Sequence, residues 1–159
     1  MRTISATCQD TLRLMIPRLS LLAILATVTS LAQELTSLEK AFQDSMSNVT
    51  LAGRFSRQGA TNLSEDKYVI EKVTKLKDDL WQFDAVVAYR GQNMKMPIPV
   101  HVKWAGDTPV ITLTDEMVAG MGKFTVRLVI YRGQYAGMWS GADGHGGGQM
   151  FGTITKTAP

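Results

Sequence analysis

Residues suited to covalent or metal chemistry are scarce in this chain. Among 159 residues there are one cysteine, Cys8, and two histidines, His101 and His145. A single cysteine cannot form a disulfide within the chain, so the fold must rely on its core. A serine-histidine-acid triad would depend on one of the two histidines, and no Gly-x-Ser-x-Gly elbow is present. The inventory favours a protein without enzymatic activity, and we expect no cofactor.

Excess charge of one sign is also lacking after residue 32. The formal net charge of the whole sequence is +3, but three of its 17 basic residues and one of its 14 acidic residues precede Gln33. The rest of the chain therefore carries a net charge of +1. Because nucleic-acid binding normally requires a concentrated positive field, we expect no nucleic-acid partner.

No apolar run is long enough to span a bilayer. The run at residues 19–32 (LSLLAILATVTSLA) has fourteen residues without a charge, whereas a membrane-spanning helix needs about 20. Arg18 precedes this run and the small residues of the tripeptide 30–32 end it, which is typical of a secretory signal peptide. We expect residues 1–32 to be removed on export, which leaves a secreted or periplasmic domain without cysteine and without a membrane span. Met15 is an alternative start that gives this signal a more compact basic region.

A short amphipathic helix is predicted within residues 33–48. Thr36 and Glu39 have the spacing of a capping box, in which each side chain bonds the backbone N–H of the other residue. Four apolar side chains follow one stripe at near-helical spacing: Leu35, Leu38, Phe42 and Met46. We expect the helix to run from 37 to 47 and to lie across the end or the open side of the β-structure.

After residue 48, apolar and polar residues alternate with the period of two that is typical of strands. Eight such segments are predicted, at residues 49–58, 68–73, 81–90, 97–104, 110–114, 124–131, 135–140 and 149–156. Turn residues separate them, and the tetrapeptide Tyr-Arg-Gly-Gln occurs at 89–92 and again at 131–134. We interpret the two copies as the same hairpin turn used twice.

Short strands without intervening helices predict consecutive antiparallel hairpins. Curling such a sheet until its edges meet buries the apolar face and removes exposed strand edges. We therefore predict a mainly β fold for residues 49–159, an antiparallel up-and-down meander that forms a small barrel, with a β-sandwich as the alternative. Pro97 and Pro99 cannot donate to a strand ladder, so we expect weak pairing on one side of the fourth strand and incomplete closure there.

The inward-facing positions of this barrel are the candidate ligand site. Those with large apolar side chains are Trp81, Phe83, Tyr89, Val100, Trp104, Phe124 and Leu128. If they line a cavity, the domain binds a small apolar or amphipathic molecule. If they fill the interior, the domain is a structural or interaction module with a packed core. The sequence leaves both alternatives open.

Glycine is concentrated near the C-terminus, where eight of the fourteen glycines lie within residues 133–152. This predicts a glycine-rich hairpin loop between the last two strands. We expect Gly137 to let Trp139 pack against the barrel end and help to close it. A third functional alternative is a metal or enzymatic site near this loop. Its candidate ligands are His101, Asp143 and His145, on the basis that protein metal sites use three or four such side chains.

The most distinctive motif is Tyr135-Ala136-Gly137-Met138-Trp139-Ser140-Gly141, with Gly152 after it. With the strand pattern of residues 49–156, this motif resembles calycin-type barrels, the class that includes the lipocalins. The resemblance implies that the Gly-x-Trp helps to close a barrel whose interior holds a small apolar ligand. The motif and its glycine-rich tail are also similar to uncharacterised exported bacterial proteins. Lipocalins have Gly-x-Trp on the first strand and this chain has it on the seventh, so no binding residue is carried over.

Overall fold

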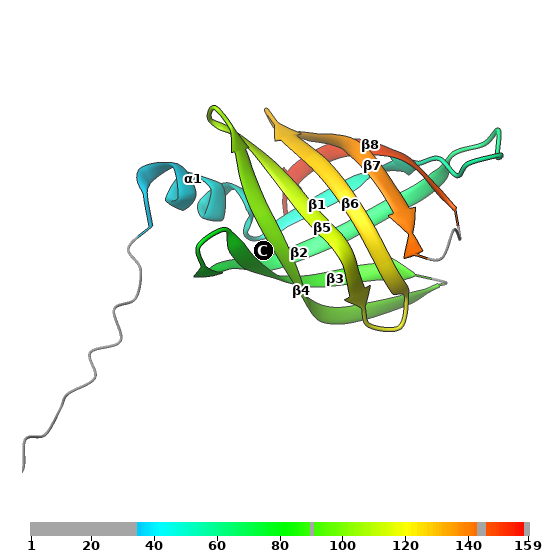
Figure 1. The fold of residues 1–159 in the computed structure, drawn as a ribbon, viewed down its shortest axis with the longest axis horizontal. Coiled ribbons are helices and arrows are strands. Elements are labelled where there is room, and N and C mark those ends of the chain that lie inside the picture. Colours follow the sequence, from blue (N-terminus) through cyan, green and yellow to red (C-terminus); the bar gives the residue numbers. More distant parts are fainter. Residues whose placement is uncertain (1–34, 90, 143–145, 158–159) are drawn as a thin grey trace, which may run out of the picture. The chain divides into compact units, whose positions relative to one another are not determined.

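The chain folds into a closed β-barrel preceded by one helix. The computed structural model describes residues 35–157 except for 90 and 143–145. Its elements are α1 (Ser37–Met46), β1 (Val49–Phe55), β2 (Ser64–Lys77), β3 (Leu80–Tyr89), β4 (Gln92–Ala105), β5 (Thr108–Val118), β6 (Gly122–Tyr131), β7 (Gln134–Gly141) and β8 (Gly147–Lys156). Each strand pairs antiparallel with the next, and β8 pairs with β1 (Figure 1). The predicted up-and-down barrel is confirmed, and the β-sandwich alternative is wrong. The expected incomplete closure at the fourth strand is also wrong, because β4 pairs with β5 and the barrel is closed.

Helix α1 begins with the predicted capping box. The Thr36 hydroxyl accepts from the Glu39 N–H at 3.3 Å, and the Glu39 carboxylate accepts from the Thr36 N–H at 3.0 Å. The helix ends at Met46, one residue before the predicted end. Phe42 and Met46 are buried against the barrel, as the apolar stripe indicates.

Three strands, namely β2, β4 and β5, are at least six residues longer than predicted, and β6, β7 and β8 are each two residues longer. Residues 64–70 of β2 pair with β1 and residues 68–77 pair with β3, so this strand of 14 residues is shared by two staggered neighbours. Strands that tilt around a barrel need such a stagger. The alternation of side chains gives no sign of it, and the predicted segment covered only the middle of β2.

The two Tyr-Arg-Gly-Gln segments close hairpins of the same loop length. Tyr89 pairs with Gln92 and Tyr131 pairs with Gln134, so each turn has two central residues. In the second turn both central residues have positive φ, 48° at Arg132 and 71° at Gly133. Positive φ at both positions defines the type I′ turn, whose twist matches that of the strands.

The pairing between β4 and β5 is short because of the prolines in β4. Its register runs only from His101↔Thr112 to Ala105↔Thr108. In an antiparallel ladder alternate residues direct N–H and C=O groups at the same neighbour. The next position after His101 that would donate to β5 is Pro99, which has no N–H. Within the described residues, β4 and β5 therefore pair only in the part of the barrel nearer to α1.

The core fills the barrel and continues into the helix. Buried apolar side chains come from α1 and from all eight strands. The largest that are almost fully buried are Trp81 and Tyr135, each 1% exposed. Packing of this kind leaves little room for a ligand inside the barrel.

Candidate functional site

A pocket of about 380 Å³ lies beside α1 at one end of the barrel. Helix α1 supplies residues at the spacing of one helical face: Leu38, Ala41, Phe42, Ser45 and Met46. Two hairpins and the last strand supply the rest: Trp104, Asp107, Thr108, Pro109, Ile130, Tyr131, Arg132, Gly133 and Ile154. The pocket is therefore a groove between the helix and the β4–β5 and β6–β7 turns.

The groove exists because α1 is held on its other side. The Gln43 side chain donates to the Val73 carbonyl at 2.8 Å, and the Val73 N–H donates to the Ser47 hydroxyl at 3.1 Å. Lys75 of β2 forms an ion pair of 2.6 Å with Glu39. These contacts bind the helix to β2, so the opposite face of the helix stays open toward the hairpins.

The floor of the pocket is aromatic and aliphatic. Phe42 meets Trp81 and Trp104 edge to face, with ring centroids 5.3 Å and 5.7 Å apart. Edge-to-face pairs of this kind add about 0.5–1.5 kcal/mol to the burial of the rings. Arg132 is an exposed polar residue of the lining, and its guanidinium stands 5.2 Å from the centre of the Tyr131 ring.

A second unusual feature is a carboxyl group inside the barrel. Asp66 of β2 is 8% exposed, and the Tyr135 hydroxyl donates to its Oδ2 at 3.2 Å. The phenol reaches Asp66 from β7 because the two intervening positions in the register are Gly152 and Gly53. A Cβ at Gly152 would lie 2.7 Å from the Tyr135 ring, and one at Gly53 would lie 2.6 Å from its hydroxyl. Side chains at either glycine would therefore exclude the tyrosine.

Burial controls the acidity of this group. Burial raises the pKa of Asp66 above its ordinary value, and hydrogen bonds from Tyr68 and Tyr135 lower it only in part. Burial and the neighbouring carboxylate also raise the pKa of both tyrosines. Asp66 was not among the predicted interior residues. The alternation of Asp66, Tyr68 and Ile70 was the available signal, since it puts the acid on the apolar face of its strand.

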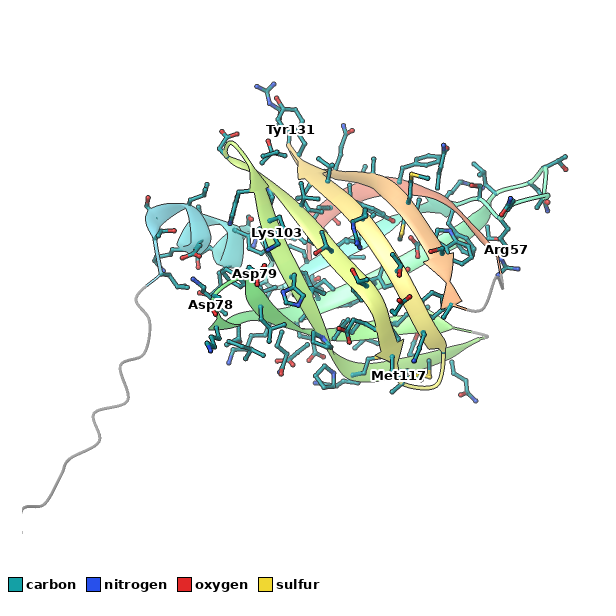
Figure 2. The ribbon with its side chains drawn as sticks, in the orientation of Figure 1. Arg57, Asp78, Asp79, Lys103, Met117 and Tyr131 are labelled. Carbon is teal, nitrogen blue, oxygen red and sulfur yellow. The ribbon has the colours of Figure 1, made fainter. Side chains whose placement is uncertain are left out.

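Asp79 forms a small charged cluster on the surface near α1. Its carboxylate pairs with His101 Nδ1 at 2.9 Å and with the ammonium group of Lys103 (Figure 2). Hydrogen bonds from Lys103 and His101 lower the pKa of Asp79 to about 2. The predicted metal ligand His101 is thus paired with an acid of the β2–β3 turn. The other two, Asp143 and His145, lie outside the described residues. Among the residues that the structure describes, no group of three His, Cys, Asp or Glu side chains could hold a metal ion.

The predicted interior residues occupy different positions in the barrel. Four are buried in the core: Trp81, Phe83, Val100 and Leu128. Phe124 and Trp104 are half-buried. Of the seven predicted residues, Trp104 alone is among the described residues that line the pocket. Tyr89 ends β3, but its side chain lies outside the described part of the structure. The pocket was missed because it depends on which turns face α1, which strand alternation does not report.

Gly137 and Trp139 lie on β7 close to the other end of the barrel. A Cβ at Gly137 would overlap the backbone of Arg127 on β6, so only glycine fits between the strands. The Trp139 indole N–H donates to the Ser56 carbonyl at 3.2 Å, and its ring meets Phe55 edge to face at 5.8 Å. Trp139 thus connects β7 to the segment that follows β1.

Comparisons with known proteins give no relative. No family model matches the chain, and neither the curated proteins nor the solved structures contain a significant match. The resemblance to calycin-type barrels therefore stays a prediction. Across the described residues, no helix has the length and apolar character needed to cross a bilayer.

Proposed function

We propose that this chain is an exported, non-catalytic binding protein that holds a small apolar or amphipathic molecule in the pocket beside α1. The observation that carries the proposal is the pocket itself, an apolar groove of about 380 Å³. Sites for small molecules are usually clefts of about 300–1,000 Å³ with mostly apolar walls and a few polar groups. The groove agrees with both criteria.

The barrel interior is a poorer location for a ligand than the groove. Trp81, Phe83 and Val100 are each no more than 5% exposed and belong to one continuous core. Opening a cavity among them would cost several kcal/mol of packing, of the order measured for large core truncations. A ligand at the barrel end avoids this cost.

The rim favours a ligand with one polar end. Arg132 and Asp107 stand at the edge of the groove, whereas Phe42, Met46 and Ile130 are buried beneath it. An apolar body can therefore cover the floor while a polar group stays in water beside the two turns. Amphipathic molecules meet this description better than hydrocarbons.

Export is part of the proposal. Residues 1–32, the predicted signal peptide, lie outside the described residues. Intact mass of the protein recovered after expression in its host checks this part: a chain that begins at Gln33 supports it, and a chain that retains the apolar run contradicts it.

The pocket is tested by filling it. Residues 33–159 contain α1, the whole barrel and its core, and form a compact unit. Titrating this unit with the fluorophore 1-anilinonaphthalene-8-sulfonate should give saturable binding with quenching of tryptophan emission, since Trp104 lines the pocket. Ala41 is exposed and lines the same pocket, so Ala41→Phe should weaken binding about tenfold, by occupying space without disturbing the core.

Ala119→Phe is the matched control, because Ala119 is exposed in the β5–β6 turn at the other end of the barrel. This variant should bind the fluorophore like the unmodified protein. Saturable binding that Ala41→Phe leaves unchanged would contradict the assigned site. A complete lack of saturable binding would favour the second candidate, an interaction module with a filled core, for which the tight packing of the interior is the supporting observation.

A further inference from the structure

The charges of this protein are segregated around the barrel. Strands β6, β7, β8 and β1, which are adjacent in the sheet, contain no aspartate or glutamate. They carry four basic residues: Arg54, Lys123, Arg127 and Lys156. The acidic residues of the other strands lie on β2, β3 and β5. Although the net charge is near zero, the wall formed by β6, β7, β8 and β1 has no acidic residue on its strands.

The same wall carries exposed apolar side chains. Val129, Ala136 and Phe151 stand next to one another across β6, β7 and β8. Val129 is 43% exposed and Phe151 is 45% exposed. Met138 is 64% exposed. It lies two residues beyond Ala136 and therefore on the same face of β7. Leu63, Leu76 and Met117, also exposed, lie elsewhere.

Basic groups border these apolar side chains. Arg54 is the register partner of Phe151, and Arg127 is that of Met138. The Arg127 guanidinium donates to the Thr114 hydroxyl at 2.9 Å, which holds its charge beside β5. We refer to Val129, Ala136, Met138 and Phe151, together with Arg54 and Arg127, as the β6–β8 face.

We propose that the β6–β8 face docks on an anionic lipid surface. Exposed apolar side chains that project from a convex barrel wall can insert among lipid headgroups, and cations beside them attract the negative surface of the membrane. Each arginine or lysine near such a surface contributes about 1 kcal/mol, or roughly fivefold in affinity. The absence of acids on these four strands limits the opposing repulsion to flanking acids, such as Glu65 of β2, which is the partner of Arg54 in the β1–β2 register.

A lipid surface fits this face better than an acidic protein does. Neither of the two described pockets is lined by Met138 or Phe151. Methionine is flexible and adapts to a soft environment without a shape of its own to match. The pocket beside α1 is lined by Tyr131, the last residue of β6, which lies two residues beyond Val129, and by Arg132 after it. Docking of this face would therefore bring that pocket near the lipid.

Vesicle partitioning of residues 33–159 tests the proposal. The protein should sediment with vesicles of phosphatidylcholine mixed with phosphatidylglycerol and stay in solution with phosphatidylcholine alone. Partitioning should fall as salt is raised. The double variant Met138→Thr/Phe151→Thr should partition about tenfold more weakly, since two partly inserted apolar side chains are lost. Arg54→Gln should weaken partitioning about fivefold.

Matched controls come from the other wall. Met117 is 61% exposed on β5 beside Glu116, and Lys72 is exposed on β2. Met117→Thr and Lys72→Gln should change partitioning less than twofold, and all variants should keep the thermal midpoint of the unmodified domain. Ala41→Phe should partition normally, which separates lipid docking from binding in the pocket.

Three results would overturn the proposal. The first is no partitioning onto anionic vesicles. The second is an equal loss in the variants of the β6–β8 face and in the controls. The third is binding to soluble heparin that matches vesicle binding and is insensitive to Met138→Thr/Phe151→Thr, because that pattern belongs to a polyanion site without lipid insertion.

Discussion

At the scale of single residues, Asp66 stands out as the buried charged side chain among the described residues. It is an acid on the apolar face of β2, held by a tyrosine from β7. Its pKa is raised by burial, so the folded protein binds a proton more readily than the unfolded chain does. The stability that this proton provides is complete below the ordinary pKa of an aspartate. It is lost as pH rises through the higher pKa of the folded state.

Replacing Asp66 by Asn should therefore change how stability depends on pH. The amide cannot ionise, so Asp66→Asn should gain stability relative to the unmodified domain between pH 4 and pH 7. Urea unfolding at both pH values measures the difference in free energy. Asp78→Asn is a matched control, because Asp78 is exposed in a turn. The backbone φ of Asp78 is 50°, a conformation that asparagine also adopts. An equal difference at the two pH values for Asp66→Asn would show that the carboxyl is not desolvated.

At the scale of elements, α1 is the cap of the barrel and Phe42 is its main contact. Phe42 is 4% exposed and packs against Trp81, Phe83 and Trp104. The prediction of a helix across the barrel end came from the capping box and the apolar stripe, both local signals. The end that it covers, and the groove that it leaves, depend on the distant contacts of Gln43, Ser47 and Lys75.

Phe42→Ala should destabilise the domain by about 3–5 kcal/mol, the usual cost of emptying a buried aromatic position. Urea unfolding followed by tryptophan emission measures this loss, since two tryptophans contact the ring. Lys40→Ala, on the exposed side of the same helix, is the control and should cost less than about 0.5 kcal/mol. A loss below about 1 kcal/mol for Phe42→Ala would mean that the helix does not pack on the barrel in solution.

In strand β4, the rule that proline cannot donate to a strand ladder predicts part of the pairing but not the length of the strand. Pro97 and Pro99 predicted a weakly paired side, and the register with β5 stops at His101. The same rule did not give the full extent of β4, whose pairing with β3 begins at Gln92. Met94 and Met96 alternate with Lys95 in this first part, so the apolar-polar alternation extends past the predicted start of the strand at residue 97.

At the scale of the whole molecule, the barrel was predictable and its sites were only partly so. Alternation with a period of two fixes which side chains can face inward, and short turns fix the order of the strands. It does not report which side chains meet across the barrel, as Tyr135 and Asp66 do. Trp104, predicted to be internal, lines the pocket because β4 ends beside α1.

The net charge did not predict the wall without acids, because a sum carries no information about where the charges lie. A net charge of +1 after residue 32 argues against nucleic-acid binding and is silent about distribution. The signal was present in the sequence, since between Met117 and Pro159 the only acidic residue is Asp143. Closure of the barrel places β6, β7 and β8 next to β1, which also lacks acids, so these four strands form one continuous wall without acidic residues.

The tyrosine that crosses two glycines to reach an acid ties together four positions that are far apart in the chain: Gly53, Asp66, Tyr135 and Gly152. Their fates in evolution are linked. A homologous chain that gains a side chain at Gly53 or Gly152 has no room for the phenol. One that loses the phenol leaves the buried carboxylate with the hydrogen bond from Tyr68 and without the one from β7. Correlated replacement of this quartet is therefore a sequence signature by which distant members of the same lineage can be distinguished from barrels that only share the topology.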